Sequence, residues 1–382
     1  MQQIYLDHNA TTPLRADVLE AMLPYLQTHF GNPSSVHGTG RRAKQGLEYA
    51  REQVAACIGA KPAEVLFTSG GTESNSLAIH GILQTNETPK SHIITTPIEH
   101  SSVLESLQAL THEGYSLTLL PVDGEGRVNP SDLDTALRPE TGLVSIGLAN
   151  PELGTIQPIA ACSQIIRERG VMLHVDAVQA AGKLPLDVES LGVDLLSLSA
   201  HKIYGPKGIG ALYVRKGTDL TPILRGGPQE REKRAGTENV AAAVGFGAAA
   251  VLAGQELETR AAQLIGLTTQ LWQGINNKIP NVIRNTPQQA CLPNTLNLGF
   301  PGASGEGLMM GLDLAGIAVS TGSACAAGSV EPSHVLLALG RDAAAAKSAI
   351  RFSLGKDTSE QDIERVLDVL PGVVERVRAA NQ

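Results

Sequence analysis

The chain has 382 residues, of which 42% are hydrophobic and 18% are charged, and its formal net charge is −8. This length favours two domains, or a large and a small one, and it is sufficient to bury a sizeable core. The acidic balance gives no default attraction to nucleic acid or to an anionic membrane, so neither is an expected partner.

The four cysteines, Cys57, Cys162, Cys291 and Cys325, are widely spaced and form no CxxC pair. They are no disulfide framework for a chain of this size, so a reducing cytoplasm is the expected location. The N-terminal stretch MQQIYLDHNATTP lacks the basic and apolar regions of a signal peptide. The most apolar stretch, residues 240–254, is shorter than the roughly 20 residues that span a bilayer. We expect it to be a buried helix.

In chain order, short apolar runs alternate with helical stretches through the first two thirds of the chain. The predicted strands cover residues 64–69, 92–98, 143–149, 171–178, 193–200 and 210–214. The predicted helices between them cover residues 71–84, 101–114 and 159–170. This alternation predicts an α/β fold whose mostly parallel sheet has helices on both faces. Ligands of such sheets bind beyond the carboxyl ends of the strands.

The pattern changes near Arg260. A long helix over residues 259–279, short strands over 295–300, 318–322 and 349–354, and a last helix over 359–380 predict a smaller α+β unit. The N-terminal strand and turn over residues 4–12 are expected to rejoin it. The predicted domains are therefore a large α/β domain over 13–258 and a small α+β domain over 1–12 and 259–382, which carries the segment around Cys325.

A glycine pair followed by a hydroxyl, Gly70, Gly71 and Thr72, stands between a predicted strand and a predicted helix. Free backbone N–H groups at a helix N-terminus, with a hydroxyl beside them, suit a phosphate group. The alternative is an ordinary strand-to-helix turn in which Thr72 is the N-cap.

Asp176 and Lys202 each follow an apolar strand, and they are 26 residues apart. Adjacent strands would bring their ends together. An amine that forms a Schiff base and a carboxylate that pairs with a pyridine nitrogen are the two residues that pyridoxal phosphate needs most. Ser199 and His201 would add phosphate contacts. The alternatives are a structural hydrogen bond for Asp176, or an arginine or metal partner, and a solvated side chain for Lys202.

Cys325 lies in STGSACAAGSVEPSH, a segment rich in Gly, Ser and Ala that we expect to be a flexible loop. Unreactive cysteines are usually buried, so packing explains a loop cysteine poorly, and Cys325 is a candidate nucleophile. The other three cysteines lie in apolar or helical contexts, and we expect them in the core.

Arg351 and His100 allow two interpretations each. Arg351 lies in an apolar strand pattern, where a guanidinium needs a carboxylate, either from a substrate or from an internal acid. His100 follows a predicted strand, where an imidazole can stack on a planar cofactor, move protons, or only cap a helix.

Taken together, these residues resemble the pyridoxal-phosphate-dependent cysteine desulfurases of the class-V aminotransferase group, over essentially the whole chain. The motifs that carry the resemblance, in the family's order, are YLDHNATTP, FGNPSSVHGTG, FTSGGTESNSLAI, TPIEHSSVL, HVDAVQAAGKLPLD, SLSAHKIYGPKGIGALYVRKG, RAGTENV, TGSACAAGSVEPSHVL and IRFSLG. The long form of the segment around Cys325 is similar to the branch that serves iron–sulfur cluster assembly and housekeeping sulfur delivery. The resemblance implies the fold-type-I scaffold.

The resemblance also implies the residues that hold pyridoxal 5'-phosphate. Lys202 would bind it covalently, Asp176 would bond the pyridinium nitrogen and Gln179 the ring hydroxyl, and His100 would stack on the ring and take part in catalysis. The phosphate would be bound by Gly71, Thr72, Ser199, His201 and, across a dimer interface, Thr237.

For the substrate, the resemblance implies that L-cysteine is converted to L-alanine and a persulfide on Cys325, with Arg351 holding the substrate carboxylate. One position departs from the family, which usually reads Asn-Asn-Glu where this chain has Asn150, Pro151 and Glu152. Proline has neither an amide side chain nor a backbone N–H. Either Asn150 shifts to bind the substrate, or that contact is missing.

The implied partners are a second copy of the chain and a sulfur-acceptor protein such as an iron–sulfur scaffold. No intrinsic metal is expected, although Cys325 would be available to a transient iron–sulfur cluster on a partner. The alternatives are a cysteine or cystine lyase or a class-V aminotransferase, which would not need Cys325, and a sulfur-relay protein with little turnover, which Pro151 alone favours.

Overall fold

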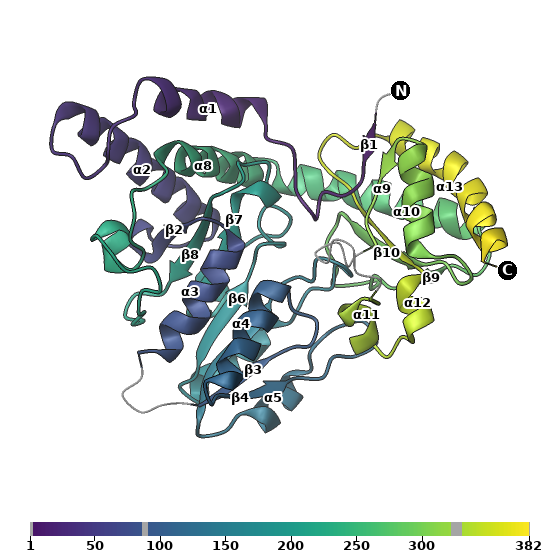
Figure 1. Ribbon diagram of the computed structural model, residues 1–382, viewed down its shortest axis with the longest axis horizontal. Helices are drawn as coiled ribbons and strands as arrows, with labels where there is room; N and C mark the ends of the chain where they lie inside the picture. The colour runs from purple at the N-terminus through teal and green to yellow at the C-terminus, as the bar shows by residue number, and fades with distance from the viewer. Residues whose placement is uncertain (1–2, 86–90, 322–330, 382) are drawn as a thin grey trace.

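The computed structural model describes residues 3–85, 91–321 and 331–381. The chain forms two lobes that lie side by side (Figure 1), one built on a seven-stranded sheet and the other on two small sheets. The N-terminal strand lies in the second lobe, which also contains the C-terminal helix, and the chain then crosses into the first lobe.

The large sheet is mostly parallel. Its strands, from one edge to the other, are β2 (Val65–Thr68), β8 (Gly210–Val214), β7 (Leu195–Ser199), β6 (Met172–Asp176), β5 (Thr141–Gly147), β3 (His92–Thr95) and β4 (Ser116–Leu119). Strand β8 runs antiparallel to both of its neighbours, and the other neighbouring pairs are parallel. The predicted α/β fold is confirmed. The edge strand β4 was not predicted from the sequence.

Helices cover both faces of this sheet. One face packs on α3 (Gly71–Leu83) and α4 (Ser101–His112). The other face packs on α1 (Ala16–Gln27), α2 (Gly38–Cys57), α5 (Pro130–Ala136), α6 (Ile159–Glu168), α7 (Val188–Leu191) and α8 (Val240–Gln255). Short 3₁₀ helices are η1 (Pro62–Glu64), η2 (Ala200–Lys202) and η3 (Gln229–Glu232). No element is predicted from sequence for residues 13–57, where α1 and α2 lie.

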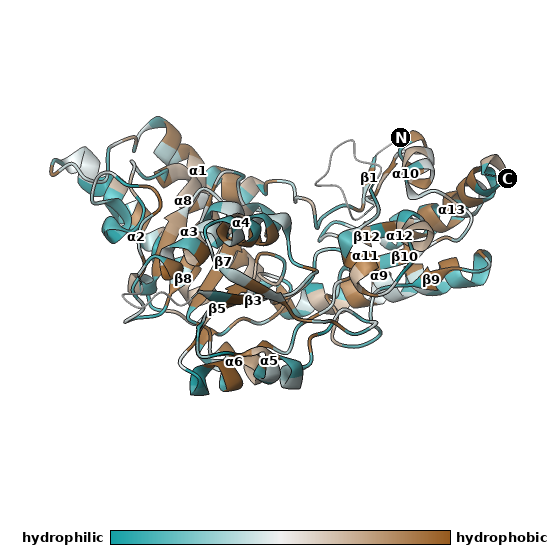
Figure 2. Cartoon of the chain, turned by 60° about the horizontal axis from the view of Figure 1, so that its bottom comes forward, coloured by the Kyte–Doolittle hydropathy of each residue, from teal (hydrophilic) through white to brown (hydrophobic). Residues whose placement is uncertain are grey.

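The two faces follow from the alternation of side chains along each strand. In β2, Val65 and Phe67 join the core under α2 and α8, whereas Leu66 joins the core under α3 and α4. All four residues of β2 are buried. A strand that is covered on both faces has to be apolar throughout, and Figure 2 shows hydrophobic residues, in brown, concentrated in the strands and polar ones, in teal, on outer helices such as α2.

The second lobe has its own hydrophobic core. Strands β12 (Ala349–Ser353), β10 (Thr295–Gly299) and β9 (Ile283–Arg284) form an antiparallel sheet, and β1 (Ile4–Tyr5) pairs in parallel with β11 (Ile317–Ala318). The helices are α9 (Leu257–Lys278), α10 (Gly305–Leu314), α11 (His334–Ala338), α12 (Ala343–Lys347) and α13 (Glu360–Ala380). Leu6 belongs to the same core as α9, α10 and α13. The exact domain boundaries stay a prediction.

Helix α8 is the buried helix expected over residues 240–254: it packs on α1 and α2, and ten of its residues are buried. It meets α9 at an angle of 69°. Within the described ranges, no single helix is long and apolar enough to cross a membrane; this bent pair passes only by its combined length and composition.

Candidate functional site

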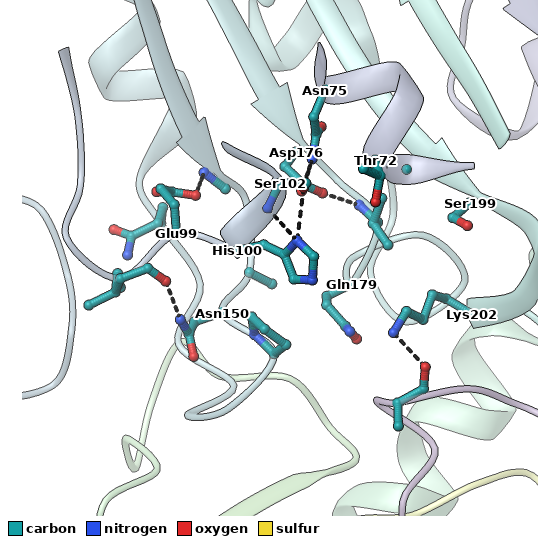
Figure 3. Close-up of a pocket in the computed structure, with 18 of the residues that line it drawn as sticks. Thr72, Asn75, Glu99, His100, Ser102, Asn150, Asp176, Gln179, Ser199 and Lys202 are labelled. Atoms are coloured by element: carbon teal, nitrogen blue, oxygen red, sulfur yellow. Dashed lines mark hydrogen bonds between the residues drawn. The ribbon is translucent and has the colours of Figure 1, made fainter. Parts of the chain in front are cut away.

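A cavity of about 260 Å³ lies at the carboxyl ends of β5, β6 and β7, and Figure 3 shows the residues that line it. This is the edge at which ligands bind in open α/β sheets. Nine of the residues that the sequence pointed to line it: Gly71, Thr72, His100, Asn150, Asp176, Gln179, Ser199, His201 and Lys202.

One end of the cavity is formed by the N-terminus of α3. The N-cap is Gly70, which offers no side-chain bond to the helix, so the alternative in which Thr72 caps the helix is wrong. Free N–H groups and the positive end of the helix dipole make this end of the cavity suitable for an anion. A Cβ atom at Gly71 would approach a Val178 methyl carbon to 2.8 Å. The absence of a side chain at Gly71 therefore keeps this end of the cavity, the phosphate cradle, open.

Asp176 ends β6, and its carboxylate is held by two donors. The side-chain amide of Asn75, on α3, donates to Oδ2 at 2.8 Å, and the backbone N–H of Val178 donates to Oδ1 at 2.9 Å. These bonds fix the direction of the carboxylate while leaving it in the cavity wall. Asp176 is therefore available to a ring N–H.

Lys202 follows β7 on the short helix η2. Its Nζ donates to the backbone carbonyl oxygens of Asn9 and Ala10, the latter at 2.8 Å. These two carbonyls hold the amine at the cavity wall. The amine and the Asp176 carboxylate thus line one cavity, as the order of the strands predicted.

His100 is the N-cap of α4. The Ser102 N–H donates to His100 Nδ1 at 3.1 Å, so Nδ1 is an acceptor and the proton of the neutral ring lies on Nε2. The ring is also 2.8 Å from the Ser102 hydroxyl, and it lies between Asp176 and Gln179 in Figure 3. His100 therefore both caps α4 and lines the cavity.

His201 and Ser199 lie beside Lys202. Burial, with the positive charges of Lys202 and Lys207, lowers the pKa of His201 to about 4, so its ring is neutral near pH 7. A neutral imidazole can donate one hydrogen bond to a phosphate but does not add charge. Its Nδ1 is 3.1 Å from the Thr11 hydroxyl.

Arg351 lies in β12, behind the cavity rather than in its lining. Its guanidinium pairs with Asp7 at 2.6 Å and reaches the Pro151 carbonyl at 3.3 Å. Pro151 itself lines the cavity. The internal carboxylate that we considered is therefore present, and Arg351 is one residue removed from the cavity wall.

The side chain of Asn150 is occupied by its own turn. Its Oδ1 accepts the N–H groups of Glu152 and Leu153, each at 2.9 Å, and its Nδ2 donates to the Ile98 carbonyl. These bonds weigh against a shift of Asn150 toward a substrate, which stays a prediction. A missing contact is the simpler consequence of Pro151.

Thr237, like Arg351, lies outside the cavity lining. Thr237 is exposed on the loop before α8, and this loop is tied to the first turn of α3 by an ion pair between Arg234 and Glu73. Cys325 falls outside the described residues. Of the other cysteines, Cys162 is buried, whereas Cys57 and Cys291 are half-buried. Burial raises the pKa of all three thiols.

Sequence reasoning missed Glu99, which lines the cavity beside His100. Its carboxyl accepts the Thr96 hydroxyl at 2.7 Å and the Gly147 N–H at 2.8 Å. Burial raises the pKa of Glu99 to about 8; the bond from Thr96 opposes this, and the negative charge of Asp176 adds to it. The available signal was its place in TPIEHSSV, directly after a strand.

The cavity fits pyridoxal phosphate on three independent grounds. It has a phosphate cradle at the start of α3, an oriented carboxylate at Asp176 and a primary amine at Lys202. Pyridoxal phosphate requires these three partners in one site. Among the described residues, no group of three His, Cys, Asp or Glu side chains forms a metal site.

Comparison with known proteins agrees with this geometry. The Aminotransferase class-V family matches residues 4–366. The chain belongs to the class-V aminotransferase family. Enzymes of this family use pyridoxal phosphate, so the expected cofactor is confirmed at the level of the family.

The similarity to individual class-V proteins extends over nearly the whole chain. A relative named cysteine desulfurase IscS, from Dictyoglomus turgidum, is 49% identical over 99% of this chain and 96% of its own length. A solved structure of a NifS-like protein is 40% identical, with a TM-score of 0.93 over 98% of this chain and all of its own. A structure of SspA in complex with cysteine is 37% identical, with a TM-score of 0.82 over 92% of this chain and 98% of its own. The predicted fold-type-I scaffold is confirmed.

Proposed function

We propose that this protein is a pyridoxal-phosphate-dependent cysteine desulfurase, which converts L-cysteine to L-alanine and transfers the sulfur to Cys325. The observation that carries the proposal is the meeting of Lys202, Asp176 and the N-terminus of α3 in one cavity. The full-length similarity to an IscS cysteine desulfurase supports the same activity.

The residues divide the work according to their chemistry. When bound, pyridoxal phosphate supplies an electron sink for the bonds at the substrate Cα. Asp176 would keep a proton on the ring nitrogen, and Lys202 would carry the proton that leaves Cα. The thiolate of Cys325 would attack the substrate sulfur and become a persulfide, while alanine leaves.

L-cysteine is the proposed substrate, and its carboxylate is the group that Arg351 would recognise. The relative SspA was solved in complex with cysteine, which supports this choice. Arg351 is already paired with Asp7, so the substrate would have to compete for, or share, the guanidinium.

The experiment measures alanine released from L-cysteine by the purified protein with added pyridoxal phosphate and a reductant. Cys325→Ala should abolish catalytic alanine formation while keeping the cofactor absorbance. Cys291→Ala is the matched control, because this half-buried thiol should be replaceable without loss of activity. Lys202→Ala should abolish both the activity and the covalent attachment of the cofactor.

The outcomes separate the competing functions. Equal alanine formation by wild type and Cys325→Ala would contradict a sulfur-accepting Cys325. Pyruvate and sulfide in place of alanine would identify a lyase. A wild type that binds the cofactor and yet turns over no cysteine would favour a sulfur-relay protein.

We further propose a homodimer that acts in a reducing cytoplasm and delivers sulfur to an acceptor protein such as an iron–sulfur scaffold. Apolar side chains exposed on and after α1, which include Leu26 and Phe30, support a second copy as partner. Thr237 would contribute to the partner's cavity, which is consistent with its exposed position.

A further inference from the structure

The side-chain amide of Gln179 is held by both of its ends. Its Nε2 donates to the backbone carbonyl of Asn9 at 2.9 Å, and its Oε1 accepts Lys183 Nζ at 2.8 Å. A flipped amide would place its oxygen against the Asn9 carbonyl oxygen, and two acceptors cannot bond to each other, so this contact excludes the flip. The second N–H of Nε2 is left for the cavity, which Gln179 lines.

Lys183 makes a second bond that fixes its own position. Its Nζ donates to Asn9 Oδ1 at 3.0 Å. Consecutive backbone turns after β6, with bonds from Ala181 to Ala177 and from Leu184 to Ala180, place Gln179 and Lys183 four residues apart on the same side. Lys183 is therefore held between one side chain of the cavity wall and one of the N-terminal segment.

Asn9 connects this pair to the rest of the site. Its Nδ2 donates to the Pro151 carbonyl at 2.9 Å and to the Thr295 hydroxyl at 2.8 Å. These bonds orient the Asn9 amide with Oδ1 toward Lys183. The orientation of Gln179 is thus set by a chain of donors and acceptors in which each amide has only one satisfactory direction.

The charges around Lys183 are consistent with this positioning role. Burial, followed by the positive charges of Lys202, Arg351 and Arg260, lowers the pKa of Lys183 well below its usual value. A neutral amine has two N–H groups, the number of acceptors that Nζ contacts. Lys183 can therefore hold both oxygens in either protonation state.

The geometry assigns Lys183 as a positioning residue that acts through Gln179: it fixes the amide so that an N–H of Nε2 points into the cavity, toward a hydroxyl or oxyanion on the bound ring. This inference rests on the proposed function, because it places the pyridoxal phosphate ring in this cavity. Lys183 would not touch the cofactor itself.

The test is a double-mutant cycle read as the equilibrium affinity of cofactor-free protein for pyridoxal phosphate. Lys183→Met and Gln179→Ala should each weaken the affinity by roughly three- to tenfold, the usual effect of one hydrogen bond. In the Gln179→Ala background, Lys183→Met should not lower the affinity further, because Lys183 would affect the cofactor only through the Gln179 side chain. The thermal midpoint of each cofactor-free variant gives a second readout.

Additive losses of affinity in the double variant, or an unchanged affinity in folded Lys183→Met, would overturn the inference. Lys183→Gln, which is shorter by one atom, enters the same cycle if Lys183→Met does not fold. Lys216→Met, at an exposed lysine, is the matched control and should leave the affinity unchanged. Wild-type protein that fails to bind pyridoxal phosphate would instead refute the proposed function.

Discussion

At the scale of single residues, the protonation of Glu99 makes stability depend on pH. The folded protein raises the pKa of this carboxyl from 4.5 to about 8, chiefly through burial. Its proton therefore stabilises the fold fully below pH 4.5, and this contribution is lost as the pH rises to 8. The slope is at most about 1.4 kcal/mol per pH unit.

Glu99→Gln should remove this loss, because the amide can accept the Gly147 N–H and donate to the Thr96 hydroxyl without titrating. We expect the thermal midpoint of cofactor-free Glu99→Gln to match wild type near pH 5 and to exceed it at pH 9. The pKa of Glu152 is also raised by burial, to about 7, but Glu152 titrates in both proteins. A difference that is constant with pH would refute the assignment.

Arg351 provides a second prediction at this scale. Lysine would keep the charge but lose the planar fork, which pairs with Asp7 and which we propose also holds the substrate carboxylate. We expect Arg351→Lys to raise the KM for L-cysteine about tenfold and to change kcat much less, which is the pattern of lost substrate binding. Arg376→Lys, at an exposed arginine, is the control. A lower kcat at unchanged KM would place Arg351 in the chemical step instead.

Asp176 and Lys202 were predictable from sequence because each follows an apolar strand, and neighbouring strands bring such residues to one edge. Asn9 and Lys183 were not predictable as part of the site. Asn9 lies 170 residues before Gln179 and 286 before Thr295, so its contacts depend on how the N-terminal segment crosses between the lobes. The residue types Asn and Lys in a turn carry no signal of such bonds.

At the scale of elements, the N-terminus of α3, directly after the turn from β2, forms the part of the cavity wall that suits an anion. Gly71→Ala would direct a methyl group at Val178 and narrow the cradle. We expect the affinity for pyridoxal phosphate to fall about tenfold, whereas the affinity for pyridoxal, which lacks the phosphate, should change little. Equilibrium titration of the cofactor-free variant with both compounds measures this difference.

Gly266→Ala is the matched control, because nothing lies within 4 Å of a Cβ at this exposed position of α9. Alanine there should stabilise the helix by about 0.5–1 kcal/mol and leave both affinities unchanged. If Gly71→Ala lowered the affinity for pyridoxal phosphate and for pyridoxal equally, the cause would be a distorted cavity rather than a lost phosphate contact.

The strands that end at the site were more predictable from the sequence than the helices that cover the sheet. Strands β6 and β7 were apparent because they are short apolar runs bounded by polar residues. Helix α2 was missed because its sequence begins GTGRR and contains glycines that disfavour helix, although Gly46 is required where Tyr25 packs against it. Packing of α2 on α8 overrides that weak propensity.

At the scale of the whole molecule, the exposed apolar surface has to be explained. Leu26 is 57% exposed at the end of α1, Phe30 is 75% exposed and Val36 is 88% exposed, all within one short stretch of the first lobe. Contiguous apolar side chains in one region mark an interaction site more often than scattered ones do. The same lobe carries Thr237 on an exposed loop that is tied to α3.

Phe30→Asp combined with Leu26→Asp should therefore convert the proposed dimer to a monomer, because burying two carboxylates in an interface costs far more than it returns. The monomer should also bind pyridoxal phosphate less tightly, since Thr237 from the second copy would be missing from its cavity. Light scattering after size-exclusion chromatography measures the first effect, and titration with the cofactor measures the second.

Leu314→Asp is the matched control, because this residue of α10 is 89% exposed on the other lobe. A dimer that persists in the double variant would mean that the α1 surface serves another partner; a monomer with wild-type cofactor affinity would mean that each cavity is complete within one chain.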